Sequence, residues 1–205
     1  GTQGNDTVGH GLSSVPEMII VKNRTNAAQW TVLHKDLASD YETDLIPLNT
    51  TAAAYDDIRI WNDTEPTSSV FTVGIENDVN KLNSNYIAYC FHSVSGYSKI
   101  GSYTGNGSTQ TISGLGFEPA FVLMKRTNSA HDWVIVDNVR GYAGRTAPSS
   151  LLANESDAES NQNGDDISAF TSDGFKVGVN ARVNGNNDTY IYMAFADKRE
   201  YAYWL

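Results

Sequence analysis

Hydrophobic residues occur along the chain in short runs, which are separated by polar segments rich in Asn, Gly, Asp and Ser. Four runs are almost continuously apolar, at residues 18–22, 86–91, 121–125 and 190–195. Runs of this length between turn signals are typical of buried strands. The pattern therefore predicts strands as the main structural element of the chain.

Weaker strand signals fill the space between these runs. They lie at residues 30–35, 58–61, 70–73, 133–136, 166–170 and 175–177. Helix is expected only as short turns near residues 51–55 or 150–156. Five or six short strands per hundred residues, separated by turns, predict an all-β fold built from sandwich or jelly-roll-like units.

The chain contains an internal repeat. A shift of 103 residues places Pro16 on Pro119 and Trp30 on Trp133, and most positions between them keep their apolar or polar class. A shift of 104 residues makes nine of the 22 positions from 70 to 91 identical to their counterparts. Such self-similarity indicates two copies of one structural unit.

The repeat predicts two tandem, pseudo-symmetric β-sandwich domains, residues 1–100 and 101–205. The two copies either form separate sandwiches or share one core. The second copy opens with a turn-rich stretch at 105–108, which residues 4–6 resemble. We expect the chain, which begins at Gly1, to be a processed product or a piece of a longer one that held a similar preceding unit.

The charge of the chain argues against two classes of partner. Fourteen Lys and Arg residues face 24 Asp and Glu residues, so the formal net charge is −10. Nucleic acid is excluded as an expected partner because its phosphates would be repelled and no basic stripe is present. No apolar stretch approaches the ~20 residues that a membrane span needs, so membrane insertion is not expected.

Candidate catalytic and metal-binding patterns are weak. The four histidines align with other residue types in the repeat, and no nucleophile or metalloprotease motif occurs. The stretch 159–170 resembles the start of a calcium loop but has Phe170 where the last ligand should be. We therefore expect no enzyme activity, no catalytic residue, no cofactor and no metal site, with a looser cation site at Asp165 and Asp166 as the open alternative.

Aromatic residues supply the candidate contact sites. Trp30 and Trp133 are expected to be core anchors, with sugar stacking as the alternative. Trp61 lacks a Trp counterpart in the repeat and precedes a polar loop. It is therefore the better candidate for a partner-facing aromatic, together with Asn62 and Asp63.

The C-terminal segment carries three further aromatic candidates, Tyr201, Tyr203 and Trp204. They are expected either to pack as a last strand on their own domain or to dock onto a neighbouring subunit. The single cysteine, Cys90, excludes an internal disulfide and is expected to be a buried small hydrophobe.

Several segments resemble a repeated domain of tail-fibre and other virion proteins of tailed bacteriophages, especially marine ones. These segments are residues 8–12, 16–22, 60–63, 86–91, 96–107 and 114–119. The resemblance covers nearly the whole chain but brings no catalytic residues. The aromatic tail departs from the pattern of that family.

The resemblance implies a non-enzymatic virion structural module, located in a tail fibre or tail tip, that adheres to the host surface. It also implies a homo-oligomer, with a trimer favoured, that contacts other virion proteins and a host-surface glycan or outer-membrane receptor. Two alternatives stay open. One is an architectural capsid or tail decoration protein, and the other is a carbohydrate-degrading tail protein.

Overall fold

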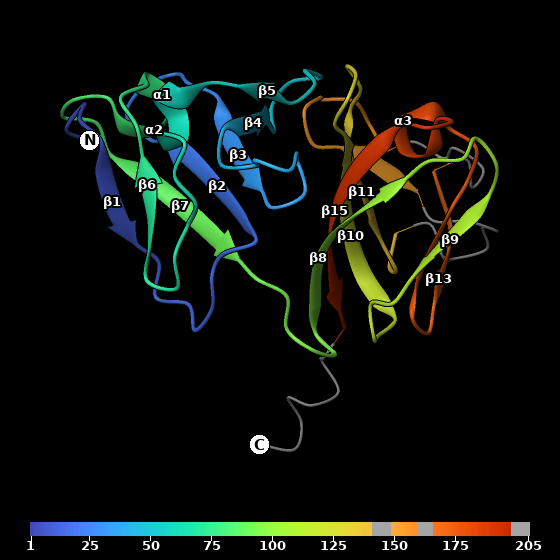
Figure 1. The fold of residues 1–205 in the computed structure, drawn as a ribbon. Helices are drawn as coiled ribbons and strands as arrows, with labels where there is room; N and C mark the ends of the chain where they lie inside the picture. Colours follow the sequence, from blue (N-terminus) through green and yellow to red (C-terminus); the bar gives the residue numbers. More distant parts are fainter. Residues whose placement is uncertain (141–148, 160–165, 198–205) are drawn as a thin grey trace. The chain divides into compact units, whose positions relative to one another are not determined.

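The computed structural model describes residues 1–140, 149–159 and 166–197 of the 205-residue chain (Figure 1). These residues form antiparallel β-sheets and three very short helices, so the predicted all-β class is confirmed. The chain divides into two compact units, unit 1 (Gly1–His92) and unit 2 (Ser93–Leu205). The division expected between residues 100 and 101 falls inside strand β8 (Ser98–Thr104), whose sheet partner is in unit 2.

Unit 1 contains a five-stranded sheet with the order β5-β4-β3-β2-β7 and a two-stranded sheet formed by β1 and β6. Its elements are β1 (Asp6–Gly9), β2 (Met18–Asn23), β3 (Trp30–His34), β4 (Asp44–Pro47), β5 (Tyr55–Asp56), α1 (Ile58–Trp61), β6 (Val70–Val73), α2 (Asn77–Asn80) and β7 (Tyr86–Phe91).

Unit 2 contains a five-stranded sheet with the order β12-β11-β10-β15-β8 and a three-stranded sheet with the order β13-β14-β9. Its elements are β8, β9 (Gln110–Ser113), β10 (Pro119–Arg126), β11 (Trp133–Asp137), β12 (Ser150–Leu152), β13 (Ile167–Thr171), β14 (Gly174–Val177), α3 (Ala181–Asn184) and β15 (Thr189–Ala196).

The central part of the large sheet is arranged alike in the two units. The order β3-β2-β7 in unit 1 corresponds to β11-β10-β15 in unit 2. In the small sheets, β6 pairs with β1 as β14 pairs with β9, and Val8 faces Phe71 as Ile112 faces Phe175. The strands that carry the sequence repeat therefore hold equivalent places.

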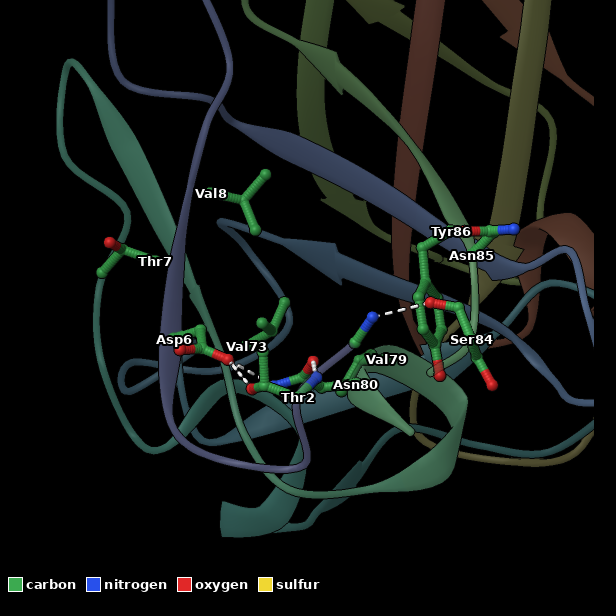
Figure 2. A pocket seen from close by; sticks show the side chains of 11 residues that line it. Thr2, Asp6, Thr7, Val8, Val73, Val79, Asn80, Ser84, Asn85 and Tyr86 are labelled. Carbon is green, nitrogen blue, oxygen red and sulfur yellow. Dashed lines mark hydrogen bonds between the residues drawn. The ribbon is translucent and has the colours of Figure 1, made fainter. Parts of the chain in front are cut away.

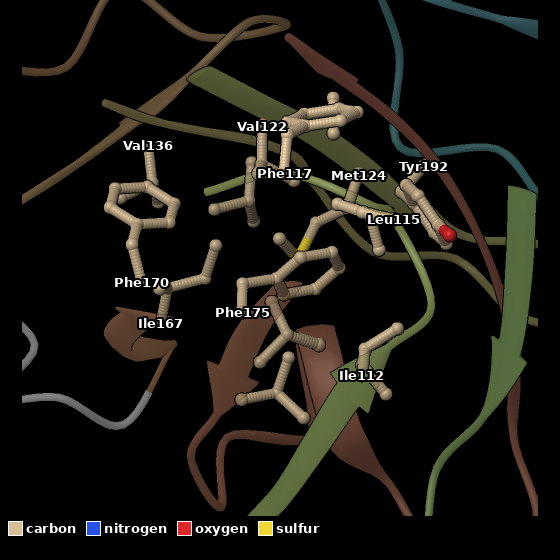
Figure 3. Packing of buried hydrophobic residues seen from close by; sticks show 14 residues of the cluster. Ile112, Leu115, Phe117, Val122, Met124, Val136, Ile167, Phe170, Phe175 and Tyr192 are labelled. Carbon is tan, nitrogen blue, oxygen red and sulfur yellow. The ribbon is translucent and has the colours of Figure 1, made fainter. Parts of the chain in front are cut away.

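The core of unit 2 lies between its two sheets (Figure 3). Ile112 and Phe175 from the small sheet belong to the same buried cluster as Val122, Met124 and Tyr192 from the large sheet. Inward positions alternate along the strands, as expected when one face of a sheet packs against another sheet. Unit 1 has a corresponding cluster that joins β2, β3, β4 and β6 to α1 and α2.

Two local expectations from the sequence are wrong. Residues 58–61 form helix α1 instead of a strand, because the Asp57 side chain caps its start by accepting from the Arg59 N–H at 3.0 Å. Asn62 ends the helix in the left-handed conformation, with φ at 54°. Neither expected helical turn is present, since residues 150–152 form strand β12 and residues 51–54 precede strand β5 without helical structure. In the described ranges, no helix has the length and apolar character needed to cross a membrane.

Candidate functional site

Trp61 is a core residue of unit 1, although we expected it to face a partner. Only 1% of its surface is exposed, and it packs in the cluster with Ile60 and Phe71. Its indole Nε1 donates to the Asp44 carbonyl oxygen at 3.1 Å, which satisfies its polar atom inside the protein. The ring is therefore not available to a ligand, because the last turn of α1 directs it inward.

Asn62 and Asp63 follow Trp61 in the sequence but lie on the outside of unit 1. Asn62 is half-buried and accepts from the Asn5 amide at 2.7 Å, whereas Asp63 is exposed. Both residues have left-handed backbone conformations, with φ of 54° and 44°. The structure thus separates the three residues of this candidate site, with one ring in the core and two polar side chains on a surface turn.

The other candidates are the aromatic residues of the C-terminal segment and the proposed cation site. Tyr201, Tyr203 and Trp204 lie outside the described residues, and so does Asp165. The other half of the proposed cation loop, Asp166, is 3% exposed and binds the Arg182 guanidinium at 2.7 and 2.5 Å. Its charge is therefore neutralised within unit 2. Within the part of the chain that the structure describes, no group of acidic, His and Cys side chains could hold a metal ion.

Of the two tryptophans expected in the core, Trp133 is buried with 1% exposure. Trp30 is half-buried, and the Lys22 ammonium lies over its ring at 5.8 Å from the ring centre. That face of the Trp30 ring is thus engaged by a cation. Cys90 is half-buried and packs against the core, and burial raises the pKa of its thiol to about 11.

Unit 1 contains a cavity of about 420 Å³ where the start of the chain crosses α2 and the start of β7 (Figure 2). Val8, Val73, Val79 and the ring of Tyr86 supply apolar lining. Its polar lining comes from Thr2, Asp6, Asn80, Ser84 and Asn85, with Gly1 and Thr7 completing the wall.

Asn80 organises the polar side of the cavity. Its side-chain oxygen accepts from the Thr2 N–H at 2.9 Å, and its amide donates to the Gly4 carbonyl at 2.6 Å and to Asp6 at 3.1 Å. Asp6 also accepts from the Thr2 hydroxyl. Hydrogen bonds from Thr2 and then from Asn80 lower the pKa of Asp6. Asn80 therefore fixes the segment before β1 against α2, and Thr2 and Asn80 together favour the ionised form of Asp6.

Tyr86 forms the other wall and is also held by hydrogen bonds. Its hydroxyl donates to the Asn77 carbonyl at 2.7 Å and accepts from the Lys81 N–H at 2.6 Å and the Asn23 amide at 3.0 Å. Burial raises the pKa of this phenol, so it stays protonated. All three hydrogen bonds of the hydroxyl are to protein groups, so the ring is the part of Tyr86 that lines the cavity. Such a site can accommodate an apolar or aromatic group.

The same framework recurs in unit 2. Asn184 is fully buried, accepts from the Asn106 N–H at 3.0 Å and donates to the Ser108 carbonyl at 2.6 Å. The Tyr190 hydroxyl donates to the Ala181 carbonyl at 2.6 Å and accepts from the Gly185 N–H at 2.7 Å. We missed this framework from the sequence, although Asn80 and Tyr86 are both identical to their repeat counterparts.

A family model described as a domain of unknown function (DUF7483) matches residues 1–199. The chain belongs to this family. The DUF7483 match includes both asparagine frameworks and the cavity of unit 1, and it ends before Tyr201, Tyr203 and Trp204. Comparisons with the curated proteins and with the solved structures found no match.

Proposed function

We propose that this chain is a non-enzymatic structural module of a bacteriophage virion. It would lie in a tail fibre or tail tip and contact the host surface. The proposal is supported by the segments that resemble phage virion proteins, which extend from residue 8 to residue 119.

One structural observation carries the proposal further. Both units share the central strand order, β3-β2-β7 and β11-β10-β15, and the same Asn-centred framework, with Asn80 and Asn184 in equivalent roles. We infer that the units are tandem, pseudo-symmetric copies of one β-sandwich or jelly-roll-like module. Repeated modules suit a fibre because several weak contacts combine into strong attachment when they are linked.

The proposed assembly is a homo-oligomer, with a trimer favoured, that is bound to other virion proteins. Its external partner would be a host-surface glycan or an outer-membrane receptor. Asn62 and Asp63 remain candidates for this contact because they lie on a surface turn of unit 1, where Asn62 is half-buried and Asp63 is exposed. Trp61 is omitted from this set because its ring is buried.

A competition experiment tests the adhesion role. Labelled chain is incubated with cells that a phage carrying this module infects, and with resistant cells of the same species. We expect binding only to the sensitive cells, together with slower adsorption of the phage. Binding to neither strain by a correctly folded chain would favour a decoration protein, and release of new reducing ends from surface polysaccharide would favour an enzyme. Light scattering on the same sample tests the oligomer, which a strict monomer at micromolar concentration would contradict.

A further inference from the structure

The strand that comes last in the sequence of each unit, β7 in unit 1 and β15 in unit 2, differs in its pairing on the side away from β2 or β10. In unit 2, β15 is paired with β10 on one side and with β8 on the other. In unit 1, the large sheet ends at β7, which among the described strands pairs with β2 alone. Unit 1 therefore lacks, within the described ranges, a strand in the place that β8 holds in unit 2.

The inward face of β7 shows the consequence of this difference. Ala88 is exposed and Cys90 is half-buried, whereas their counterparts in β15, Tyr192 and Ala194, are 5% and 0% exposed. The core of unit 1 is thus open beside β7. We call this side of the strand the open edge of β7.

In unit 2, a tyrosine from β8 closes the corresponding region. The ring of Tyr103 stacks on Tyr190 with 5.0 Å between the ring centres and 11° between the planes. Its hydroxyl donates to the Val183 carbonyl at 2.6 Å. The unit 1 counterparts of Tyr190 and Val183 are Tyr86 and Val79, and both line the cavity of unit 1 (Figure 2). The cavity therefore lies where unit 2 places an aromatic ring.

The start of unit 1 shows where such a strand would enter. The Gly1 nitrogen donates to the Ser84 carbonyl at 2.6 Å, as the Gly105 nitrogen does to the Asp188 carbonyl at 2.8 Å. The Gly1 carbonyl accepts from the Asn83 N–H at 2.9 Å, and the Gly105 carbonyl accepts from the Asn187 N–H at the same distance. Gly1 thus occupies the place of Gly105, which is the residue directly after β8.

A side chain would be excluded at both of these positions. A Cβ atom at Gly1 would lie 2.3 Å from the Lys81 carbonyl oxygen, and one at Gly105 would lie 2.2 Å from the Gly185 carbonyl oxygen. The close backbone approach at this point is therefore a shared feature of the two units. It fixes the direction and the register in which a preceding strand pairs with β7 or β15.

We propose that the open edge of β7 and the adjoining cavity form an acceptor site for one more antiparallel strand. The occupant is an extended segment of the β8 type that leads directly into residue 1 and places a tyrosine ring beside Tyr86. Strand addition supplies main-chain hydrogen bonds for affinity, and the cavity for one side chain supplies specificity. The site would complete the sheet of unit 1 and cover the exposed strand, which would otherwise favour aggregation.

The register predicts which amides of β7 the added strand engages. The Arg24 N–H donates to the Asn85 carbonyl at 2.7 Å, which marks residue 85 as a position bonded towards β2. Because hydrogen bonding alternates along an antiparallel pair, the amides of Tyr86, Ala88 and Cys90 face the open edge, and those of Ile87 and Tyr89 face β2. Hydrogen exchange at the first set can therefore be compared with exchange at the second set within the same strand.

The test extends the full chain with the sequence of β8 (SKIGSYT), placed directly before Gly1. A matched control carries alanine in place of the added tyrosine. Amide hydrogen exchange is followed by NMR in the original chain and in both extended chains. We expect exchange at Tyr86, Ala88 and Cys90 to slow by roughly tenfold or more in the tyrosine form, with less slowing in the alanine form and little change at Ile87 and Tyr89. The unfolding temperature of unit 1 should rise in the same order.

Three results would overturn the proposal. Unchanged exchange in both extended chains would exclude strand addition at this edge. Equal protection by the tyrosine and alanine forms would exclude the cavity as the site of an aromatic ring. Concentration-dependent protection of the same amides in the original chain would show that a second copy occupies the edge instead.

Discussion

The two units use the same buried asparagine, but in surroundings of different polarity. Asn184 is 0% exposed, and besides Asn106 and Ser108 it bonds to Gly178 and Gln110. Asn80 is 3% exposed, and besides the Thr2 N–H and the Gly4 carbonyl it bonds to the Asp6 carboxylate and the Thr2 hydroxyl. One unit thus completes the framework with a neutral amide, and the other completes it with a carboxylate at the rim of a cavity. The framework is therefore compatible with either a closed or an open neighbouring core.

The largest expected effect comes from making unit 2 resemble unit 1. Tyr103→Ala should lower the free energy of unfolding of unit 2 by about 4 kcal/mol, because it removes a stacked ring and leaves a cavity in the core. Urea denaturation measures the change. Tyr103→Phe is the control and should lose only about 1 kcal/mol, for the hydrogen bond to the Val183 carbonyl. A loss below 1 kcal/mol for the alanine variant would contradict the role assigned to this ring.

The second prediction compares the two asparagines directly. Asn184→Ala should destabilise unit 2 by roughly 3 kcal/mol, because several buried donors and acceptors lose their partner. Asn80→Ala should cost less, about 2 kcal/mol, since water can reach its partners through the cavity. Denaturation of each variant, followed by a probe in the affected unit, measures the difference. An equal loss in both variants would show that the open neighbouring core does not weaken the framework.

The third prediction concerns a lysine that unit 2 buries completely. Lys125 is 0% exposed, and burial lowers the pKa of its ammonium to about 8, while an unfolded lysine keeps its usual value near 10.5. Between these values the unfolded chain binds a proton that the folded chain does not, so stability should rise with pH, by at most about 1.4 kcal/mol per pH unit. Lys125→Met should remove this rise and stabilise unit 2 at pH 7. A rise of the same size in the variant would assign it to other groups.

The smallest effect is on reactivity and leaves the fold unchanged. Because burial raises the pKa of Cys90 to about 11, little thiolate is present at pH 8. A thiol reagent should therefore label the folded chain roughly a hundredfold more slowly than the unfolded chain. Absorbance of the released reagent at increasing urea concentrations gives both rates. Labelling of the folded chain at the unfolded rate would show that the core of unit 1 does not shield the Cys90 thiol.

The sequence predicted most of the strands because turn signals interrupt its apolar runs clearly. Residues 18–22, 70–73 and 133–136 all lie in strands of the structure. The helix at residues 58–61 was missed because a four-residue segment with three apolar residues fits either conformation, and the Asp57 cap decided between them. Trp61 was misjudged for another reason, because neither its lack of a Trp counterpart nor the polar loop after it determines the direction of its ring.

The cavity could be predicted only in part. Asn80 and Tyr86 are visible in the repeat as identical positions, but their contacts join residues more than 70 positions apart or depend on the turn of α2. A single sequence gives no spatial distances of this kind. The comparison of the two units was needed, because β8 contacts β15 in unit 2 while the sheet of unit 1 ends at β7.

The Asn framework also affects the order in which each unit folds during synthesis. Asn80 bonds to the Gly4 carbonyl across 76 positions, and Asn184 bonds to the Ser108 carbonyl across 76 positions as well. Contacts that close nearly a whole unit require a long loop to form first, which slows folding. During synthesis from the N-terminus, the opening segment of a unit must therefore wait until its asparagine has left the ribosome. Each unit then closes late, after most of its strands are already available for pairing.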